Sequence, residues 1–177
     1  MVKKITRHVL AEFPYQVPQV ERGYANQTLY VNVGTGEIKA KPVSEEMKLK
    51  FTGGKGFDLW LLWHAVKDDT RWDSPENEIV ISSGPCGGVT QYPGSGKSLV
   101  TTISPTTDIV TDCNAGGHFG PLLKFSGWDA IEVQGIAAQD VIVVVDAIAG
   151  KVTIEELPDA PTDTHLLGAW LYEALAE

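Results

Sequence analysis

Glycine clusters separate short apolar runs along most of this chain, and this spacing constrains its fold more than any other feature. Runs of about five residues match the usual length of a β-strand, whereas a helix in a globular protein needs about ten or more. Glycine permits the backbone torsions that tight turns between strands require. The sequence therefore predicts an α+β domain of short strands and a few short helices. The clusters are Gly34 to Gly36, Gly53 to Gly56, Gly84 to Gly88, Gly94 to Gly96, and Gly116 to Gly117.

The alternation of apolar and polar residues places the individual elements. Leu29, Val31 and Val33 alternate with polar or aromatic neighbours ahead of a glycine turn, which predicts a β-hairpin over residues 28–41. The uninterrupted apolar run at 141–145 predicts a buried central strand. Further strands are expected at 78–82, 98–103, 109–111, 130–133 and 151–155, and helices at 44–51, 57–66, 119–125 and 165–177.

Three local signals refine the expected helices. Ser44 is placed to cap the first of them, because its hydroxyl can accept from the backbone of the first turn. Aromatic residues between Phe57 and Trp63 fall at helical spacing, so we expect them to face the core. Gly127 follows the helix at 119–125 and is expected to end it in a left-handed conformation.

Composition narrows the class of protein. A length of 177 residues suits a single domain, and the formal net charge of −9 argues against general nucleic-acid binding, which needs a basic face. No apolar run is long enough to cross a membrane and no secretory signal is visible, so we expect a cytoplasmic protein. Cys86 and Cys113 are too few for a disulfide framework or a four-thiolate metal site, and we expect buried thiols.

The segment Gly94-Ser95-Gly96-Lys97-Ser98 suggests a nucleotide-binding P-loop at first sight. A P-loop opens with a glycine where this chain has Gln91, and it leads into a helix, whereas the residues after Ser98 favour a strand. We therefore reject a P-loop. The segment can still attract an anion, because glycines let backbone N–H groups converge on an oxygen and Lys97 adds a positive charge.

Two further glycine loops strengthen the hypothesis of a phosphate-bearing ligand. Residues 114–117 precede an expected helix, whose first N–H groups favour an anion, and Asn114 can offer an oxygen to a hard cation. The loop at 53–56 contains Lys55 and also precedes a helix. No nucleophile–base pair or metal cluster is evident, so we assign no catalytic residue. His118 lies beside the second loop, but a solvent-facing position at a helix start explains it equally well.

The order of the motifs is more specific than any one of them. They are Leu29 to Gly36, Gly53 to Gly56, Ser74 to Asn77, Ser83 to Pro85, Gly96-Lys97, Ser104-Pro105, Asn114 to Gly120, Leu123 to Asp129, and Glu132 to Gly135. Over residues 23–155 this succession resembles the N-terminal domain of the aldehyde:ferredoxin oxidoreductase family of tungsten or molybdenum pterin enzymes. The resemblance implies a base domain of two packed β-sheets against which the pterin cofactor lies.

The resemblance also implies roles for the candidate loops. The family's pterin-contacting arginine aligns with Lys97. Its asparagine, whose backbone carbonyl binds the magnesium ion that bridges the two pterin phosphates, aligns with Asn114, and the loop glycine that follows aligns with Gly116. The implied cofactor-binding residues are Gly96, Lys97, Asn114, Ala115, Gly116 and Gly117, with magnesium at Asn114.

Some residues depart from the family pattern. Lys55 and Lys97 stand where the family has arginines, and lysine cannot make the planar bidentate contact that arginine makes. His118 replaces an aromatic residue of the family. These departures leave the cofactor geometry and the substrate open.

For the whole enzyme, the resemblance implies oxidation of an aldehyde to a carboxylate, with electrons passed through a 4Fe–4S cluster to ferredoxin. The cluster would lie in further domains that this chain does not contain. We expect residues 23–177 to be the pterin-binding base domain, incomplete at its C-terminal end and inactive alone. We expect residues 1–22, interrupted by Pro14 and Pro18, to be a leading extension that packs on a neighbour.

Two alternatives to the enzyme remain open at this point. One is a non-enzymatic module that binds a phosphorylated ligand or a partner protein on the same surface. The other is a structural domain without a ligand. The sequence also leaves open whether the protein forms a homo-oligomer.

Overall fold

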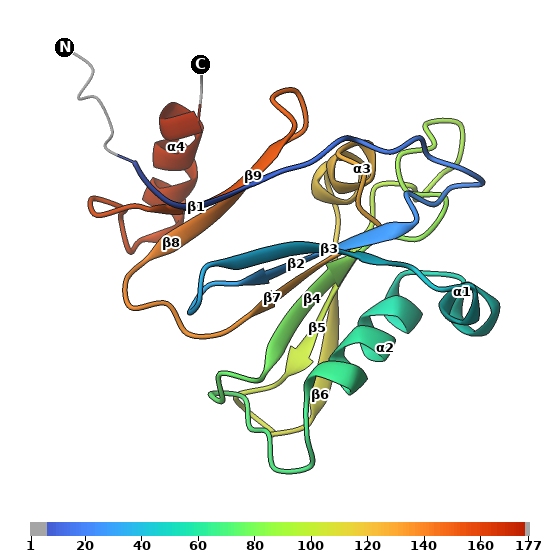
Figure 1. The fold of residues 1–177 in the computed structure, drawn as a ribbon, viewed down its shortest axis with the longest axis horizontal. Coiled ribbons are helices and arrows are strands. Elements are labelled where there is room, and N and C mark those ends of the chain that lie inside the picture. Colours follow the sequence, from blue (N-terminus) through green and yellow to red (C-terminus); the bar gives the residue numbers. More distant parts are fainter. Residues whose placement is uncertain (1–6, 176–177) are drawn as a thin grey trace.

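Residues 7–175, which the computed structural model describes, form two β-sheets and four helices (Figure 1). This arrangement confirms the expected α+β class. Residues 1–6 of the expected extension and 176–177 of the expected last helix lie outside the described residues. The strands are β1 (His8–Pro14), β2 (Gln27–Asn32), β3 (Glu37–Pro42), β4 (Glu78–Ser82), β5 (Ser98–Ile103), β6 (Val110–Ala115), β7 (Ala130–Gln134), β8 (Val141–Asp146) and β9 (Lys151–Glu156), and the helices are α1 (Glu45–Phe51), α2 (Lys55–Ala65), α3 (Phe119–Phe125) and α4 (Thr164–Leu175).

The larger sheet has six strands in the order β3-β2-β7-β4-β5-β6, and the smaller has three in the order β1-β9-β8. Neighbouring strands are antiparallel except for β2 and β7, which run parallel. The hairpin expected at 28–41 is confirmed as β2 and β3. The cap at Ser44 is also confirmed, because its Oγ accepts from the backbone N–H of Met47 at 3.1 Å.

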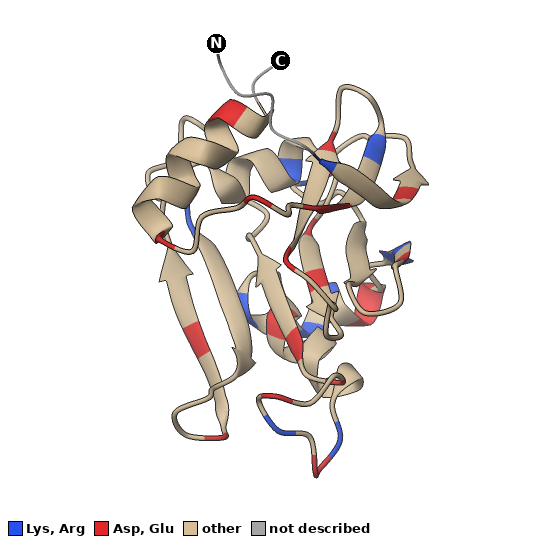
Figure 2. Ribbon diagram, turned by 90° about the vertical axis from the view of Figure 1, so that its left-hand side faces the viewer, with Lys and Arg blue, Asp and Glu red and all other residues tan. Residues whose placement is uncertain are grey.

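The two faces of the larger sheet have different partners. On one face, Leu29 and Val31 of β2 pack with Ile131 of β7 against the smaller sheet, and Trp128 completes this core. On the other face, which α2 covers, Val80 packs against Leu62. Side chains alternate between the faces along each strand, so polar residues of β2 and β7 also lie buried under the helices. Figure 2 shows Lys and Arg interspersed with Asp and Glu along the ribbon.

The segment at 8–14, which we expected to belong to a leading extension, forms β1 and pairs with β9 of the same chain. Phe13 lies opposite Val152 in this pairing and packs against the core. The proline that obscured the strand, Pro14, stands at its end, where a missing N–H is tolerated. The contact expected with a neighbour is thus made within the chain.

The expectation of a buried central strand at 141–145 is wrong. This run forms β8, an edge strand of the smaller sheet whose residues are all half-buried, while β9 is central. Val143 packs against the core, and Ile142 lines a groove with Leu167 and Leu171 of α4. An uninterrupted apolar run therefore indicates that other residues pack against both faces of a strand. It does not indicate whether the strand is central or at the edge of its sheet.

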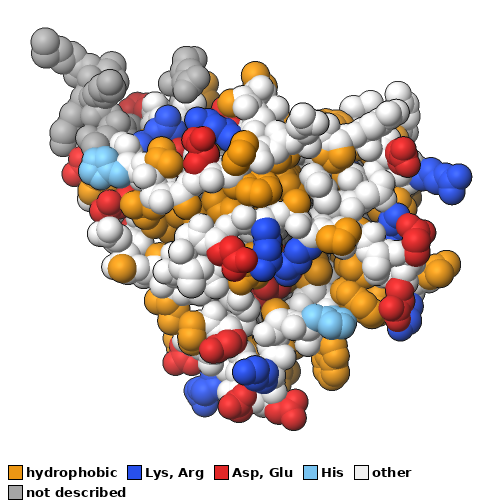
Figure 3. All heavy atoms as spheres, in the orientation of Figure 1, with side chains coloured by type: hydrophobic (Ala, Val, Ile, Leu, Met, Phe, Trp, Pro, Cys, Tyr) orange, Lys and Arg blue, Asp and Glu red, His pale blue; other side chains and the backbone are white. Residues whose placement is uncertain are grey.

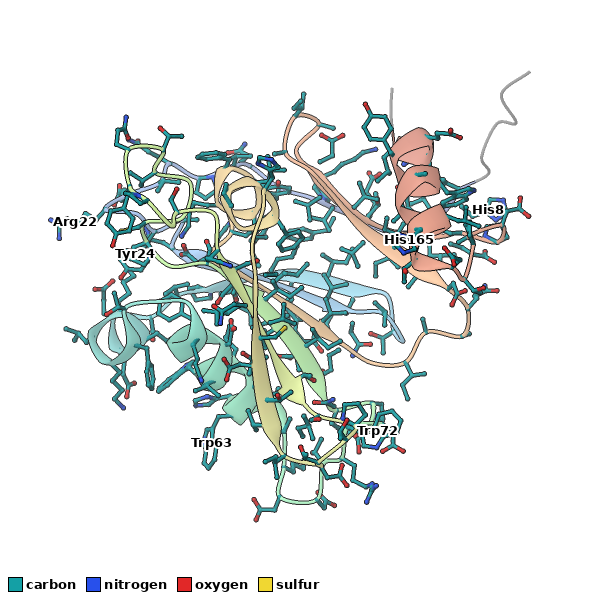
Figure 4. All side chains as sticks on the ribbon, turned by 180° about the vertical axis from the view of Figure 1, so that it is seen from behind. His8, Arg22, Tyr24, Trp63, Trp72 and His165 are labelled. Carbon is teal, nitrogen blue, oxygen red and sulfur yellow. The ribbon has the colours of Figure 1, made fainter. Side chains whose placement is uncertain are left out.

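Two expectations about burial are also wrong. Trp63 is 79% exposed, and Figure 4 shows it pointing away from α2, whereas Phe57 and Leu62 of the same helix are buried. The thiols of Cys86 and Cys113 are exposed, because one lies in a glycine-rich surface loop and the other on an edge strand. None of the helices in the described part of the chain is long and apolar enough to span a membrane.

A buried ion pair lies at the end of the larger sheet where β2 and β7 begin. Lys124 of α3 and Asp129, just before β7, are both almost completely buried and in contact. The Asp129 carboxylate also accepts from the backbone N–H groups of Ala25 at 3.0 Å and Asn26 at 2.8 Å, and the Lys124 ammonium donates to the Gly23 carbonyl at 2.8 Å. The chain entering β2 is thereby tied to the connection between α3 and β7.

We expect Asp129→Ala to lower the free energy of unfolding by about 3–5 kcal/mol, because it leaves the buried Lys124 charge and two backbone N–H groups without a partner. Urea denaturation measures this loss. The control is Asp73→Ala, whose carboxylate lies 3.7 Å from Arg71 on the surface and whose loss should cost less than about 1 kcal/mol. Equal losses in the two variants would show that the buried network does not support the fold.

Candidate functional site

Two of the glycine loops meet at one end of the larger sheet. Ser98, the first residue of β5, pairs with Ala115, the last residue of β6, so the loops before β5 and after β6 lie side by side. A methyl group added at Gly96 would stand 3.0 Å from the Gly117 carbonyl, and one added at Gly116 would stand 3.2 Å from the Lys97 ammonium. The structure thus brings the two loops together at one end of the larger sheet.

The third loop packs against the same end. A methyl group at Gly54 would lie 3.2 Å from the Leu99 side chain, and one at Gly53 would lie 3.1 Å from the Pro85 ring. The loop at 84–97 therefore lies between the loops at 53–56 and 114–117, and we call it the central loop. Figure 1 shows it beside α3. Residues 98–103 form a strand and not a helix, which agrees with the rejection of a P-loop.

The two lysines of these loops differ in charge balance. Lys55 is paired with Asp112 of β6 at 2.6 Å, so its charge is largely neutralised within the protein. Lys97 is exposed, and no carboxylate of the described residues lies within ion-pair distance of it. Lys97 therefore carries the free positive charge that an anionic ligand at this surface would meet.

Asn114 and Ala115 were expected in a loop, but they form the end of β6. This strand is the edge of the larger sheet, and alternate carbonyl groups along an edge strand have no partner in the ladder. Both residues are exposed. The Ala115 carbonyl already accepts from the Ser98 hydroxyl at 3.3 Å, so Asn114 is the residue that could offer an oxygen to a hard cation. The described residues contain no group of three or more His, Cys, Asp or Glu that could hold a metal.

The anion-attracting character of the loop at 114–117 rests on Lys97 more than on α3. This helix has only seven residues, and His118, its N-cap, makes no side-chain capping hydrogen bond. The His118 side chain is exposed, as a residue at a helix start would be. Gly127 has a φ of 88°, which confirms the expected left-handed end of the helix.

Asp58 is a site residue that the sequence analysis did not single out. It lies in the first turn of α2, is fully buried, and accepts from the Thr101 hydroxyl at 2.9 Å, while its other oxygen has no partner among the described residues. Burial raises the pKa of Asp58 to about 7, opposed by the nearby hydroxyl groups of Ser82 and Thr101 and assisted by Asp112. The available signal was a lone carboxylate inside the apolar stripe of a helix.

Together, the two-sheet fold and the meeting of glycine loops beside Lys97, which is unpaired among the described residues, define an α+β domain with a candidate anion-binding surface. Comparison with known proteins makes this class specific. The family described as "Aldehyde ferredoxin oxidoreductase, N-terminal domain" matches residues 28–176. The chain therefore belongs to this family, as its motifs indicated.

Curated relatives agree with this assignment. Two tungsten-containing aldehyde ferredoxin oxidoreductases are similar to the chain: that of Thermococcus kodakarensis is 39% identical over 66% of this chain, and that of Pyrococcus furiosus is 40% identical over 65%. An aliphatic sulfonate oxidoreductase, WOR-like subunit, from Pyrococcus furiosus is 29% identical over 86% of the chain and 24% of its own length. The chain spans 19% of the length of each of the two aldehyde enzymes.

A solved structure shows the same fold. The active-site complex BamBC of benzoyl coenzyme A reductase, in complex with 1,5-dienoyl-CoA, superimposes with a TM-score of 0.80. The match covers 86% of this chain and 23% of the solved chain, at 24% sequence identity. This likeness supports the arrangement of the two sheets.

We expect Gly23→Ala to destabilise the protein by at least about 2 kcal/mol. Gly23 has a φ of 86°, and an added methyl group would stand 2.3 Å from the Pro85 carbonyl oxygen of the central loop. The matched control is Gly84→Ala, on the other side of this contact, where a methyl group meets nothing within 4 Å. Urea denaturation should show a change of less than about 0.5 kcal/mol for the control. A mild Gly23→Ala would contradict the close packing of this loop.

We expect Asp58→Asn to stabilise the protein increasingly between pH 5 and pH 7. The folded state keeps a proton on Asp58 up to a pKa of about 7, whereas the ordinary pKa of an aspartate side chain is 3.8. The wild type therefore loses up to about 1.4 kcal/mol per pH unit relative to the variant over this range, and the difference becomes constant above pH 7.

Urea denaturation of both proteins at each pH measures this difference, in which the titration of other groups cancels. Asp68→Asn, at an exposed position, is the control and should run parallel to the wild type. A pH-independent difference between wild type and Asp58→Asn would mean that Asp58 is ionised in the folded protein.

Proposed function

We propose that this chain is the cofactor-binding N-terminal domain of a cytoplasmic tungsten- or molybdenum-pterin oxidoreductase. The observation that carries the proposal is the unpaired charge of Lys97 at the junction of the glycine loops. Pterin cofactors of this class bear phosphate groups, and an exposed lysine among flexible backbone N–H groups suits a phosphate. Family membership supports the same assignment.

The residues present fit such a group. Gly94 and Gly117 have φ values of 88° and 120°, and a methyl group added at either would meet nothing within 4 Å, so the backbone is open to a ligand at both places. Lys97 would contact a phosphate through its ammonium group. Backbone N–H groups of Gly96, Gly116 and Gly117 would add hydrogen bonds.

Asn114 and Ala115 would contribute on the magnesium side of the cofactor. Both belong to the edge strand β6, and an oxygen of Asn114 there could coordinate a magnesium ion held with the cofactor. The bound cofactor would supply the redox chemistry. The residues of this chain would hold and orient it, and none of them is proposed to act as a catalytic acid or base.

For the whole enzyme we propose oxidation of an aldehyde to a carboxylate, with electrons passed through a 4Fe–4S cluster to ferredoxin. The names of the relatives that share 39–40% identity support this reaction. The cluster would lie in further domains, because two cysteines cannot supply four thiolate ligands. The chain is also 29% identical to a subunit of an aliphatic sulfonate oxidoreductase. Assays of the whole enzyme should therefore compare an aldehyde with an aliphatic sulfonate as the substrate.

The surroundings of the loops support the presence of further domains. Large apolar side chains are exposed near the glycine loops, and single soluble domains rarely expose many such residues in one area. We propose that the remainder of the enzyme packs over them and encloses the cofactor. These residues are Val89, Tyr92, Phe119, Leu122 and Phe125.

We expect the protein produced anaerobically with tungstate or molybdate to contain the metal and an organic pterin, measured by elemental analysis and by fluorescence of the oxidised pterin. Lys97→Met should lower both contents about tenfold or more, because a hydrogen bond to a charged phosphate is lost. Lys97→Arg should retain them.

Lys50→Met is the control, since Lys50 lies on the surface of α1 and pairs only with Glu46 at 2.7 Å. A wild-type protein without tungsten and molybdenum would overturn the proposal. Calorimetric binding of pyrophosphate without any metal or pterin would then favour a module for phosphorylated ligands.

A further inference from the structure

A second polar pocket lies on the face of the larger sheet that α1 and α2 cover. It has a volume of about 460 Å³, within the range of small-molecule sites. It is formed at the start of β4, whereas the glycine loops follow the end of this strand. On the face shown in Figure 3, basic and acidic side chains gather over β2 and β3, next to hydrophobic side chains. The residues used below are Tyr30, Lys41, Trp60, His64, Glu78 and Glu132.

Glu78 is the unexplained group of this pocket. Its side chain is 1% exposed, and neither carboxylate oxygen has a hydrogen-bond partner among the described residues. The neighbouring Glu132 is satisfied, because it accepts from the Thr28 hydroxyl at 2.6 Å and is in contact with the Lys41 ammonium. A buried carboxylate without a partner is costly, so Glu78 is a candidate for binding something that the chain itself does not supply.

The other charged groups of the pocket do not balance Glu78. Lys41 of β3 is engaged by Glu132 of β7, and Lys39 of β3 is paired with Glu37 at 2.8 Å. His64 of α2 contacts the Trp60 carbonyl through its Nδ1 at 2.7 Å. Burial raises the pKa of Glu78 to about 8, with the Glu132 carboxylate adding to the shift and Lys41 opposing it.

The walls of the pocket suit a cation with an apolar body. The Lys39 and Lys41 ammonium groups lie 4.5 and 4.4 Å from the centroid of the Tyr30 ring, so this ring already receives positive charge on its face. Trp60 of α2 also lines the pocket, together with the apolar side chains of Met47 and Leu61. The pocket thus combines an unpaired buried carboxylate, aromatic rings and hydrophobic surface.

We propose that this pocket binds a small organic cation, through an ammonium or guanidinium group paired with Glu78. A guanidinium group offers several donors to the two carboxylate oxygens, and its alkyl chain would lie against the apolar wall. The site is distinct from the glycine-loop surface and does not depend on the proposed oxidoreductase function.

The test is titration of the purified protein with n-butylguanidinium chloride, followed by tryptophan fluorescence and calorimetry. The probe keeps its charge at every pH used, so changes of affinity report the protein. Binding requires the ionised carboxylate, and it should therefore be about 30-fold tighter at pH 9 than at pH 6.5 and release a proton near pH 7. Calorimetry in two buffers of different ionisation enthalpy measures the released proton.

Variants separate Glu78 from its neighbours. Glu78→Gln should abolish binding, whereas Glu76→Gln, an exposed position on the same segment, should leave it unchanged. His64→Gln should retain most of the pH dependence, because His64 is not the group that pairs with the probe. The neutral n-butanol should not bind, and inorganic phosphate should not compete.

Absence of saturable n-butylguanidinium binding at pH 9 would overturn the proposal, as would equal binding by Glu78→Gln. Preferential binding of phosphate would also overturn it, because the lysines would then dominate the pocket. Tungsten content of Glu78→Gln should equal that of the wild type, so failure of this site and failure of the oxidoreductase proposal are distinguishable.

Discussion

The buried ion pair between Lys124 and Asp129 determines how the end of the molecule that carries the glycine loops is built. Through this pair, the chain entering β2 is tied to the connection between α3 and β7. Gly23, whose carbonyl accepts from Lys124, also packs against Pro85 of the central loop. A buried pair is favourable only while both charges and their hydrogen bonds stay in place. The position of the loops therefore follows from the packing of the core.

The two faces of the larger sheet differ in the kinds of side chain that they bury. The face toward the smaller sheet is apolar and forms the main hydrophobic cluster. The face under α1 and α2 buries carboxylates, of which Asp58 and Glu78 keep oxygens without partners and have raised pKa values. Such groups cost stability. The buried carboxylates with unpartnered oxygens among the described residues thus lie under the helices and not between the two sheets.

The candidate cofactor surface depends on which lysine is left free. Lys55 and Lys97 look equivalent in the sequence, since each follows a glycine in a glycine-rich loop. In the folded chain, Lys55 pairs with Asp112 at 2.6 Å, whereas Lys97, beside Gly116, has no carboxylate partner among the described residues. The loop at 53–56 is thus a packing element of the site, and the positive charge available to a phosphate is concentrated at the junction of the other two loops.

The sequence by itself determined the α+β class, the hairpin at 28–41, the caps at Ser44 and Gly127, and the family, because turns, caps and motif order are local properties. It misplaced the run at 141–145 and gave no partner to 8–14, because strand order depends on contacts between distant segments. The tertiary structure was needed to show that Asn114 lies in an edge strand, and that Lys97 and the buried Glu78 have no partner among the described residues. Exposure and pairing of charges arise when distant strands meet, and no local pattern encodes them.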